Sequence, residues 1–367
     1  MSYYFSAPGR TEIGGNHTDH QHGCVLAAAV DLATTAEVST RQDELLRVES
    51  EGFAPCELRI GDWEKRPEEE GTTAALLRGV AAGFAALGAV FSGLDIRVSS
   101  SVQPGSGLSS SAAFEVLLGR IFNELFFGGK ASPEQIAIIA QKAENDYFGK
   151  PCGLMDQMAS SVGGVVYMDF KDPEDPLIEK IDLDFEAYNL ALCIIDSGAG
   201  HEDLTEEYAS IPAEMASVAR FFGRNVLREV DEVEFYKKIS DVRRACGDRA
   251  VQRAMHYFAE TRRAANMATA LYEEDLTKFL ELVNASGISS ETLLQNIKPT
   301  GSTTHQELGF ALAIVKKILG TAGAARVHGG GFAGTVQAFV QLWLLPRFQA
   351  QVEEVLGEGS CHVLKVK

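Results

Sequence analysis

Runs of apolar and β-branched residues recur along the chain at lengths typical of β-strands. Residues 23–40 and 94–101 are two such runs, each bounded by turn-forming residues, and we expect them to lie in one sheet. Residues 165–170 and 190–196 have the same character, and the Pro- and Asp-rich segment between them predicts a loop. Residues 335–344, which follow a glycine-rich stretch, predict the last strand.

Apolar residues at helical spacing predict helices after residue 107. The first, about residues 110–127, carries apolar side chains on one face and follows a serine run that can cap it. The second, about residues 133–147, begins with Ser132 as its cap and places Glu144 near its end. Two further helices are predicted over residues 250–273 and 305–319.

Composition narrows the class of protein. The 367 residues are 46% hydrophobic, which is enough for a sizeable core, and the length predicts two domains or one large domain. We place the expected boundary near residue 165, with one domain over residues 1–165 and another over residues 166–367. The formal net charge of -18 argues against nucleic acids and anionic membranes as partners, because both require clustered Lys and Arg. A small-molecule partner is therefore favoured.

The cysteines and the apolar runs indicate the cell compartment. The six cysteines are widely spread without a C-x-x-C pair, which favours reduced thiols in a cytosol over a zinc knuckle or a disulfide framework. The N-terminus lacks a charged leader followed by an apolar run, and no stretch reaches the ~18 uncharged apolar residues of a membrane span. We therefore expect a soluble, cytoplasmic protein.

Residues 101–119, "SVQPGSGLSSSAAFEVLLG", place Pro, Gly and Ser directly before the first predicted helix. The backbone N–H groups and the positive dipole end of a helix N-terminus favour an anionic ligand, and glycines let the backbone come close to it. The stretch therefore predicts a phosphate cradle, although it contains neither a Walker A motif nor G-x-G-x-x-G. The alternative is a serine-capped helix with a flexible entry.

Two later glycine-rich stretches also carry candidate chemistry. Residues 149–164 put Asp156 in Gly- and Met-rich apolar surroundings, where a carboxylate needs a partner or a chemical task. The alternative is that Asp156 caps a helical turn. Residues 328–339 contain a formal G-x-G-x-x-G match, but a β-rich segment follows it instead of a helix. A tight loop that approaches a ligand or another loop is favoured there.

Residues 9–23, "GRTEIGGNHTDHQHG", gather two acidic residues, three histidines and four glycines. Such crowding has three possible interpretations. It could be a metal site formed by His17, Asp19, His20 and His22, a polar turn without a ligand, or a binding site that grips a small polar ligand. Three histidines within six residues of a turn need not converge on one ion, and no H-E-x-x-H motif is present. Taken with the later motifs, the grip on a small polar ligand is favoured.

Four stretches, "APGRTEIGGNHTDHQHG", "GSGLSSSAA", "CGLMDQ" and "GGGFAG", resemble in order the signature motifs of the GHMP small-molecule kinases. The first is similar in particular to that of the galactokinases within this family. The resemblance runs from Ala7 to about Val340, and it implies an α+β fold of two domains with the active site in the cleft between them. It also implies ATP-dependent phosphorylation of the anomeric hydroxyl of a sugar, with D-galactose as the first expectation and α-D-galactose 1-phosphate as the product.

The same resemblance assigns roles to single residues. Asp156 would stand at the anomeric hydroxyl as general base or as its orienting partner, with Arg10 beside it. Sugar hydroxyls would be bound by Asn16, His17, Asp19, Tyr208 and the backbone N–H of Gly153. ATP would lie against Gly105, Ser106, Gly107, Leu108, Ser109, Ser110 and Ser111, and Mg2+ would be bound by Ser111 and Glu144.

One pair of positions departs from the family pattern. This chain has Asn16 where the family usually has Glu, and Glu12 where the family often has Asn, so an acid and an amide trade places. In the family, the Glu at this position reaches a hydroxyl on the far side of the sugar. Asn16 in its place removes a charge-assisted hydrogen bond to that hydroxyl, worth about 1.5–3 kcal/mol. A kinase for galacturonate or N-acetylgalactosamine therefore remains an alternative, as does a sugar sensor without catalysis. In each case we expect a monomer or a weak homo-oligomer that binds neither nucleic acid nor membrane.

Overall fold

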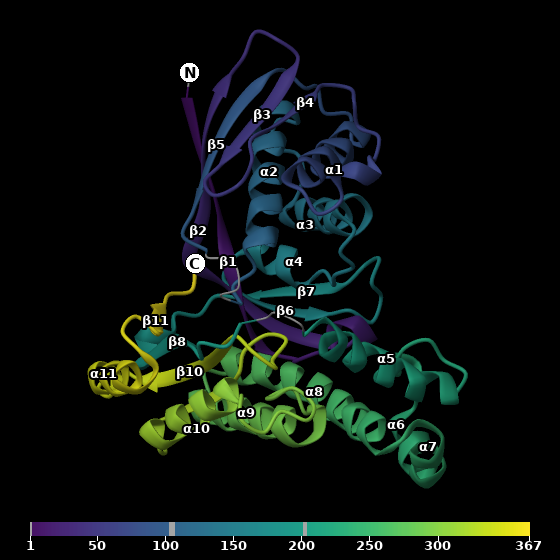
Figure 1. The fold of residues 1–367 in the computed structure, drawn as a ribbon, viewed down its shortest axis with the longest axis vertical. Coiled ribbons are helices and arrows are strands. Elements are labelled where there is room, and N and C mark those ends of the chain that lie inside the picture. The colour runs from purple at the N-terminus through teal and green to yellow at the C-terminus, as the bar shows by residue number, and fades with distance from the viewer. Residues whose placement is uncertain (1, 103–106, 201–203) are drawn as a thin grey trace.

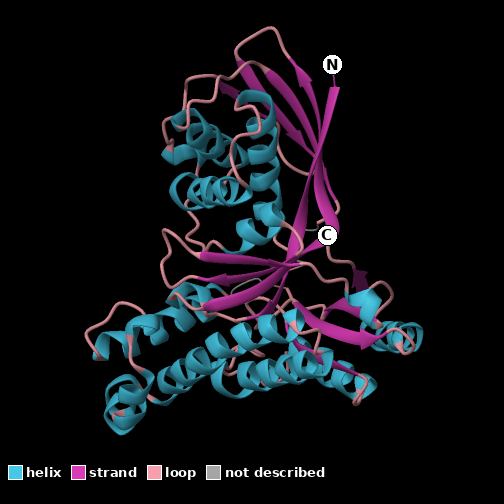
Figure 2. Cartoon of the chain, turned by 180° about the vertical axis from the view of Figure 1, so that it is seen from behind, coloured by secondary structure: helices cyan, strands magenta, loops and turns pink. Residues whose placement is uncertain are grey.

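The computed structural model describes residues 2–102, 107–200 and 204–367 of the chain. The strands of these residues form two sheets, and helices pack against both (Figures 1 and 2). One sheet comes from the N-terminal half of the chain and the other from the C-terminal half.

The N-terminal sheet is built around one long strand, β2 (Cys24–Thr40). β1 (Ser2–Gly14) runs antiparallel along one edge of β2, and two strands share its other edge. Residues 34–40 of β2 pair with β5 (Leu94–Ser100), and residues 24–28 pair with β6 (Val165–Asp169), both antiparallel. Within the described ranges this sheet has seven strands, and the remaining ones are β3 (Leu45–Ser50), β4 (Cys56–Arg59) and β7 (Leu177–Ile181).

The burial pattern of β2 follows from its position. Residues 24–30 are buried on both faces, whereas further along Ala36 and Val38 are buried and Thr35 and Glu37 are exposed. An alternating strand has one solvated face, and a continuously apolar strand is covered on both faces. β2 therefore begins in the middle of the molecule and ends in the solvated part of its sheet.

Helices cover one face of the N-terminal sheet (Figure 1). Apolar side chains of the sheet and of these helices, such as Val38, Phe84 and Phe122, form one buried cluster. The predicted Ser132 cap is confirmed, because its hydroxyl and the side chain of Gln135 form a reciprocal capping box. The helices are α1 (Thr73–Ala86), α2 (Ser110–Phe126), α3 (Pro133–Lys142) and α4 (Met155–Val162), and α3 continues into the π-helical turn η3 (Ala143–Phe148).

The C-terminal sheet is antiparallel, with strand order β11-β8-β10-β9. Its strands are β8 (Leu190–Asp196), β9 (Gly323–Val327), β10 (Thr335–Gln341) and β11 (Cys361–Leu364). The helices of this half are α5 (Thr205–Phe221), α6 (Glu232–Lys237), α7 (Ile239–Cys246), α8 (Asp248–Tyr272), α9 (Leu276–Ser289), α10 (Glu307–Leu319) and α11 (Leu345–Leu356). Short helical turns are η1 (Asp19–Gln21), η2 (Pro67–Glu69), η4 (Phe185–Tyr188), η5 (Leu227–Glu229) and η6 (Ser290–Leu294).

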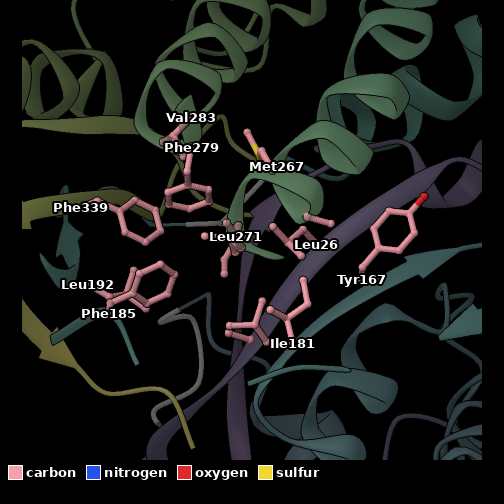
Figure 3. Close-up of a cluster of buried hydrophobic side chains, with 14 of the residues drawn as sticks. Leu26, Tyr167, Ile181, Phe185, Leu192, Met267, Leu271, Phe279, Val283 and Phe339 are labelled. Atoms are coloured by element: carbon pink, nitrogen blue, oxygen red, sulfur yellow. The ribbon is translucent and has the colours of Figure 1, made fainter. Parts of the chain in front are cut away.

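A shared apolar core joins the two halves. Leu26 of β2 and Ile181 of β7 lie in the same cluster as Phe339 of β10, Leu271 of α8 and Phe279 of α9 (Figure 3). Each fully buried side chain of this size contributes about 1.5–3 kcal/mol to stability. The halves therefore pack as one body, and residues from both can be held in fixed positions at a common site.

The segment after β11 completes the edge of β2. Residues 29–31 of β2 lie between the parts that pair with β6 and β5, and residues 365–367 occupy this gap. The N–H of Asp31 donates to the Lys365 carbonyl at 2.9 Å, and the N–H of Lys367 donates to the Ala29 carbonyl at 3.0 Å. One continuous segment thus belongs to the C-terminal sheet through β11 and to the N-terminal sheet through its last residues.

The architecture confirms the expected α+β fold class. Most of the predicted elements are present, with ends that differ by a few residues. The loop predicted for the Pro- and Asp-rich residues 171–176 is confirmed, and the edge strand β7 that follows it was not predicted. The predicted domain boundary near residue 165 falls at the first residue of β6, a strand that pairs with β2. The division into two domains at this residue stays a prediction. Among the described residues, no helix is both long enough and apolar enough to cross a membrane.

Candidate active site

An arginine–aspartate pair lies where β1 meets the first turns of α2 and α4. Arg10 of β1 binds Asp156 of α4 through two parallel hydrogen bonds, 2.6 Å from Nε to Oδ1 and 2.7 Å from Nη2 to Oδ2. Its Nη1 donates to the carbonyl of Gly107, just before α2. Such a bidentate pair is stronger and more directional than a single hydrogen bond. The two residues predicted to act together are therefore in contact.

The surroundings of Asp156 keep its carboxylate ionised. Burial raises the pKa of this carboxyl, but the charge of Arg10 and hydrogen bonds from Arg10 and Ser109 outweigh burial, so the pKa lies below its usual value. The side chain of Asp156 is 28% exposed, against 10% for Arg10. The carboxylate is thus the member of the pair that a ligand can reach.

Ser109 occupies the N-cap position of α2 in a left-handed conformation, with φ 58° and ψ 72°. Its hydroxyl donates to Asp156 Oδ2 at 2.7 Å and makes no cap hydrogen bond. The prediction that the serine run caps the helix is therefore wrong for Ser109. A non-glycine residue in this conformation costs about 1–3 kcal/mol, and such strain concentrates at functional sites. The strained backbone directs the hydroxyl toward Asp156.

Ser111 and Glu144, the predicted magnesium ligands, are hydrogen bonded to each other, with Ser111 Oγ 3.2 Å from Glu144 Oε1. The Glu144 side chain is only 3% exposed, and it also accepts from Lys150 Nζ at 3.0 Å and from Gln157 Nε2 at 2.7 Å. Mg2+ is typically held by one or two carboxylates and takes further ligands from water and phosphate. A hydroxyl beside one carboxylate fits that ion.

The predicted phosphate loop approaches the C-terminal half of the molecule. Leu108 is buried, and its carbonyl accepts from the N–H of Arg10 at 2.9 Å. A Cβ atom added at Gly107 would lie 2.9 Å from Nδ1 of His328, so no side chain fits there. Ser110 is the first residue of α2. Gly105 and Ser106 lie outside the described residues.

The turn after β1 carries His17 and Asp19. His17 has φ 56°, and its Nε2 donates to the Gly330 carbonyl at 3.0 Å. Asp19 is so close to Gly153 that a Cβ atom added there would lie 2.4 Å from Asp19 Oδ2. Burial, with smaller contributions from the charges of Glu12 and Asp156, raises the pKa of Asp19 to about 6. In the described part of the chain, no three His, Cys, Asp or Glu side chains are grouped to hold a metal ion.

Asn16 is fully buried, and protein groups surround its side-chain amide. Its Nδ2 donates to Glu12 Oε1 at 3.1 Å and to the Gly329 carbonyl at 2.7 Å. Its Oδ1 accepts from Asn296 Nδ2 at 2.9 Å and from Ser290 Oγ at 3.3 Å. An amide offers two donors and two acceptor positions, and all four are used here. The predicted contact between Asn16 and a sugar hydroxyl would have to replace one of these bonds, and it stays a prediction.

Glu12, the acid that trades places with the amide, is bound by Arg326 of β9. Arg326 Nη2 donates to Glu12 Oε1, and its Nη1 donates to the Ile13 carbonyl at 2.6 Å. The two side chains are 5% and 0% exposed. The exchanged acid and amide are therefore hydrogen bonded to each other, and an arginine from the other sheet compensates the buried charge.

Tyr208 of α5 lies against the glycine-rich loop after β9. Its hydroxyl donates to the Gly331 carbonyl at 2.9 Å, and a Cβ atom added at Gly330 would lie 2.8 Å from its ring. Burial raises the pKa of Tyr208 to about 12, so the hydroxyl keeps its proton. The three successive carbonyls of residues 329–331 thus accept from Asn16, His17 and Tyr208, all predicted sugar-binding residues.

Two residues of α8 that the sequence analysis did not single out hold the backbone of this turn. His256 Nε2 donates to the Asn16 carbonyl at 2.9 Å, and Glu260 Oε1 accepts from the N–H of Gly15 at 3.1 Å. Both side chains are fully buried. The available signal was a polar pair four residues apart, and hence on one face, of the helix predicted over residues 250–273.

Comparisons with known proteins bear on the same segments. The family model described as the GHMP kinases N terminal domain matches residues 75–164, and the galactokinase galactose-binding signature matches residues 2–40. The galactokinases of Actinobacillus succinogenes and Mannheimia succiniciproducens are each 30% identical to this chain, with 90% of this chain and 83% of each relative covered. The crystal structure of Lactococcus lactis galactokinase complexed with galactose matches with a TM-score of 0.83 and 25% identity, covering 100% of this chain and 93% of that one.

The matched segments coincide with the site described above. The galactose-binding signature spans the end of β1 and the turn that carries His17 and Asp19, and the N-terminal domain model spans Ser111, Glu144 and Asp156. With relatives of this identity and coverage, the chain belongs to the galactokinases of the GHMP kinase family.

Proposed function

We propose that this protein phosphorylates D-galactose at its anomeric hydroxyl, with ATP as phosphoryl donor and α-D-galactose 1-phosphate as product. The observation that carries the proposal is the ionised, accessible Asp156 carboxylate, held by Arg10 and Ser109 at the N-terminus of α2. The galactokinases among its relatives, and the galactose-bound structure that it resembles, support galactose as the sugar.

In this proposal Asp156 accepts a hydrogen bond from the anomeric hydroxyl and directs its oxygen toward the phosphoryl group. A carboxylate whose pKa is lowered by Arg10 is a weak base, so it orients the hydroxyl first and takes the proton only as the new O–P bond forms. Phosphoryl transfer needs little covalent help from the protein. Asp156 would therefore contribute to phosphoryl transfer by positioning the hydroxyl, and Arg10 by stabilising negative charge.

The same proposal gives the phosphates and the metal ion to neighbouring residues. ATP phosphates would lie against the loop at residues 105–111, and Ser111 and Glu144 would hold Mg2+, whose positive charge neutralises the phosphates when it is bound. Lys150 Nζ, 3.0 Å from Glu144, adds a positive charge on the same side. Asn16, His17, Asp19, Tyr208 and the N–H of Gly153 would contact the sugar, and Asn16 would exchange one of its hydrogen bonds to protein for a sugar hydroxyl.

We infer the remaining properties from the same family and from composition. The protein would work as a monomer or weak homo-oligomer in the cytoplasm, as two domains over residues 1–165 and 166–367. Its net charge of -18 supports a small-molecule substrate over nucleic acid or membrane partners.

The test is release of ADP from ATP and Mg2+ over a panel of galactose, galacturonate, N-acetylgalactosamine, glucose and arabinose. We expect galactose to have the highest kcat/KM of the panel. Turnover led by galacturonate or N-acetylgalactosamine would move the assignment to that sugar. Failure of a folded sample to turn over any sugar would contradict the kinase assignment.

A methyl group at Gly153 is expected to weaken sugar binding, because it would displace the Asp19 carboxylate. Gly153→Ala should raise the galactose KM by at least about tenfold, the equivalent of about 1.4 kcal/mol, and leave the ATP KM near its parent value. The matched control is Gly309→Ala in α10, where the added Cβ meets only Ile297, at 3.4 Å. Equal galactose KM values in the two variants would remove Asp19 from the sugar site.

Protonation of Asp19 is expected to limit sugar capture in mild acid. Its pKa is raised to about 6, so the carboxylate becomes neutral below that pH and loses its charge-assisted acceptor for a sugar hydroxyl. kcat/KM for galactose should be constant above pH 6 and fall about tenfold per pH unit below it. Asp19→Asn should be slower throughout and lack this limb. Circular dichroism at each pH monitors folding, and an unchanged acidic limb in the variant would assign it to another group.

A further inference from the structure

The peptide group that joins Gly15 to Asn16 begins the turn of the site, and α8 holds the groups on both sides of it. Glu260 accepts from the N–H of Gly15 at 3.1 Å, and His256 donates to the carbonyl of Asn16 at 2.9 Å. The next residue, His17, has φ 56°. Helix α8 therefore binds the chain directly before its strained residue.

The two α8 side chains are themselves fixed by neighbouring groups. Ser286 of α9 donates to Glu260 Oε1 at 2.6 Å, and Arg263 donates to Glu260 Oε2. Because His256 Nε2 carries the hydrogen toward a carbonyl, its Nδ1 is the acceptor for Ser289 Oγ at 2.8 Å. Both side chains are completely buried, so neither has water as an alternative partner.

The backbone of the turn has few alternative conformations. Gly15 has φ 90°, and a Cβ atom added there would lie 2.4 Å from the carbonyl oxygen of Cys24. His17 in its left-handed conformation costs about 1–3 kcal/mol, and such residues persist only where the surrounding structure over-determines them. Within the turn, Thr18 Oγ1 donates to the Gly15 carbonyl at 2.8 Å. The contacts from α8 hold the same main chain from outside the turn.

We propose that His256 and Glu260 are positioning residues that set the direction of His17 and Asp19 in the sugar site by holding the backbone on both sides of the Gly15–Asn16 peptide. This proposal rests on the proposed sugar-binding role of the turn. It assigns to α8, a helix of the C-terminal half, control over sugar affinity without any contact with the sugar. The ATP loop lies on other elements and is outside this control.

The test separates sugar affinity from ATP affinity in four variants. Glu260→Ala and His256→Ala remove the acceptor and the donor, whereas Glu260→Gln and His256→Gln keep an oxygen acceptor and an N–H donor. We expect the alanine variants to raise the galactose KM at least about tenfold with little change in the ATP KM, and the glutamine variants to restore much of the loss. Val315→Ala in α10, a buried core change with no contact with the turn, is the control for general destabilisation.

A second measurement is independent of turnover. Amide hydrogen exchange in peptides covering residues 15–19 should accelerate in both alanine variants and stay near the parent rate in Val315→Ala. Galactose and ATP KM values that rise together, or exchange that is unchanged in the alanine variants, would overturn the proposal. If the parent enzyme turns over no sugar, the proposed function fails, and the exchange experiment still decides whether α8 positions the turn.

Discussion

Asp156→Asn is expected to lower kcat for galactose by about 10²–10⁴-fold, the range typical of a lost acid–base or orienting group. The amide has nearly the same shape, so it can still contact the anomeric hydroxyl, and the galactose Kd should stay close to that of the parent. It carries no charge for Arg10, so the bidentate ion pair of 2.6 and 2.7 Å becomes a weaker neutral contact. Steady-state kinetics and calorimetric galactose titration give the two quantities separately.

The matched control is Asp62→Asn. Asp62 is 35% exposed, close to the 28% of Asp156, and it also faces an arginine, Arg78, at 3.2 Å. It lies in the N-terminal half and pairs with Arg66 and Arg78, neither of which is a predicted site residue. Its loss should leave kcat unchanged within error. A kcat for Asp156→Asn near that of the control would remove Asp156 from the mechanism, and a large rise in galactose Kd would reassign it from phosphoryl transfer to sugar binding.

Arg326→Met should lower the free energy of unfolding by about 3–5 kcal/mol, the usual cost of breaking one partner from a buried ion pair. The Glu12 carboxylate, 5% exposed, would then keep the Asn16 amide but lose its compensating charge. The Ile13 carbonyl would lose its 2.6 Å donor as well. Urea denaturation, followed by fluorescence and circular dichroism, measures the change.

Two further variants show whether the uncompensated charge of Glu12 causes the loss of stability in Arg326→Met. Glu12→Gln combined with Arg326→Met removes both charges and should be more stable than Arg326→Met alone. Lys316→Met in α10 breaks a surface pair with Glu291 and should cost at most about 1 kcal/mol. An Arg326→Met protein no less stable than Lys316→Met would show that the buried pair adds nothing to the junction of the two sheets.

Much of the fold could be predicted because its signals are local. The apolar face of α2, the Ser132 cap and the buried run in β2 each occupy one stretch of sequence, and each appears in the structure close to its predicted position. β7 was missed because it is an edge strand of alternating, mostly exposed residues, and nothing in its short pattern separates it from a polar loop.

The site was predicted less completely, because its contacts join distant residues. The Arg10–Asp156 contact spans 146 positions and was expected only through the motifs that the two residues belong to. The pairing of Glu12 with Arg326 spans 314 positions, and no sequence motif predicted that these two residues would be in contact. The same is true of Asn16: the exchange of acid and amide was visible in the sequence, but its burial depends on Ser290, Asn296 and Gly329.

The pairing of residues 365–367 with the middle of β2 has a consequence for biosynthesis. Val30 is synthesised well before its bridge partner Val366, because 336 positions separate them (366 minus 30). Until then the middle of β2 keeps an unpaired edge, which is a template for association with other chains. Nascent chains in which residue 365 has not yet emerged should therefore be prone to associate, and a shortened product that ends before residue 365 should aggregate although every residue of the site is present.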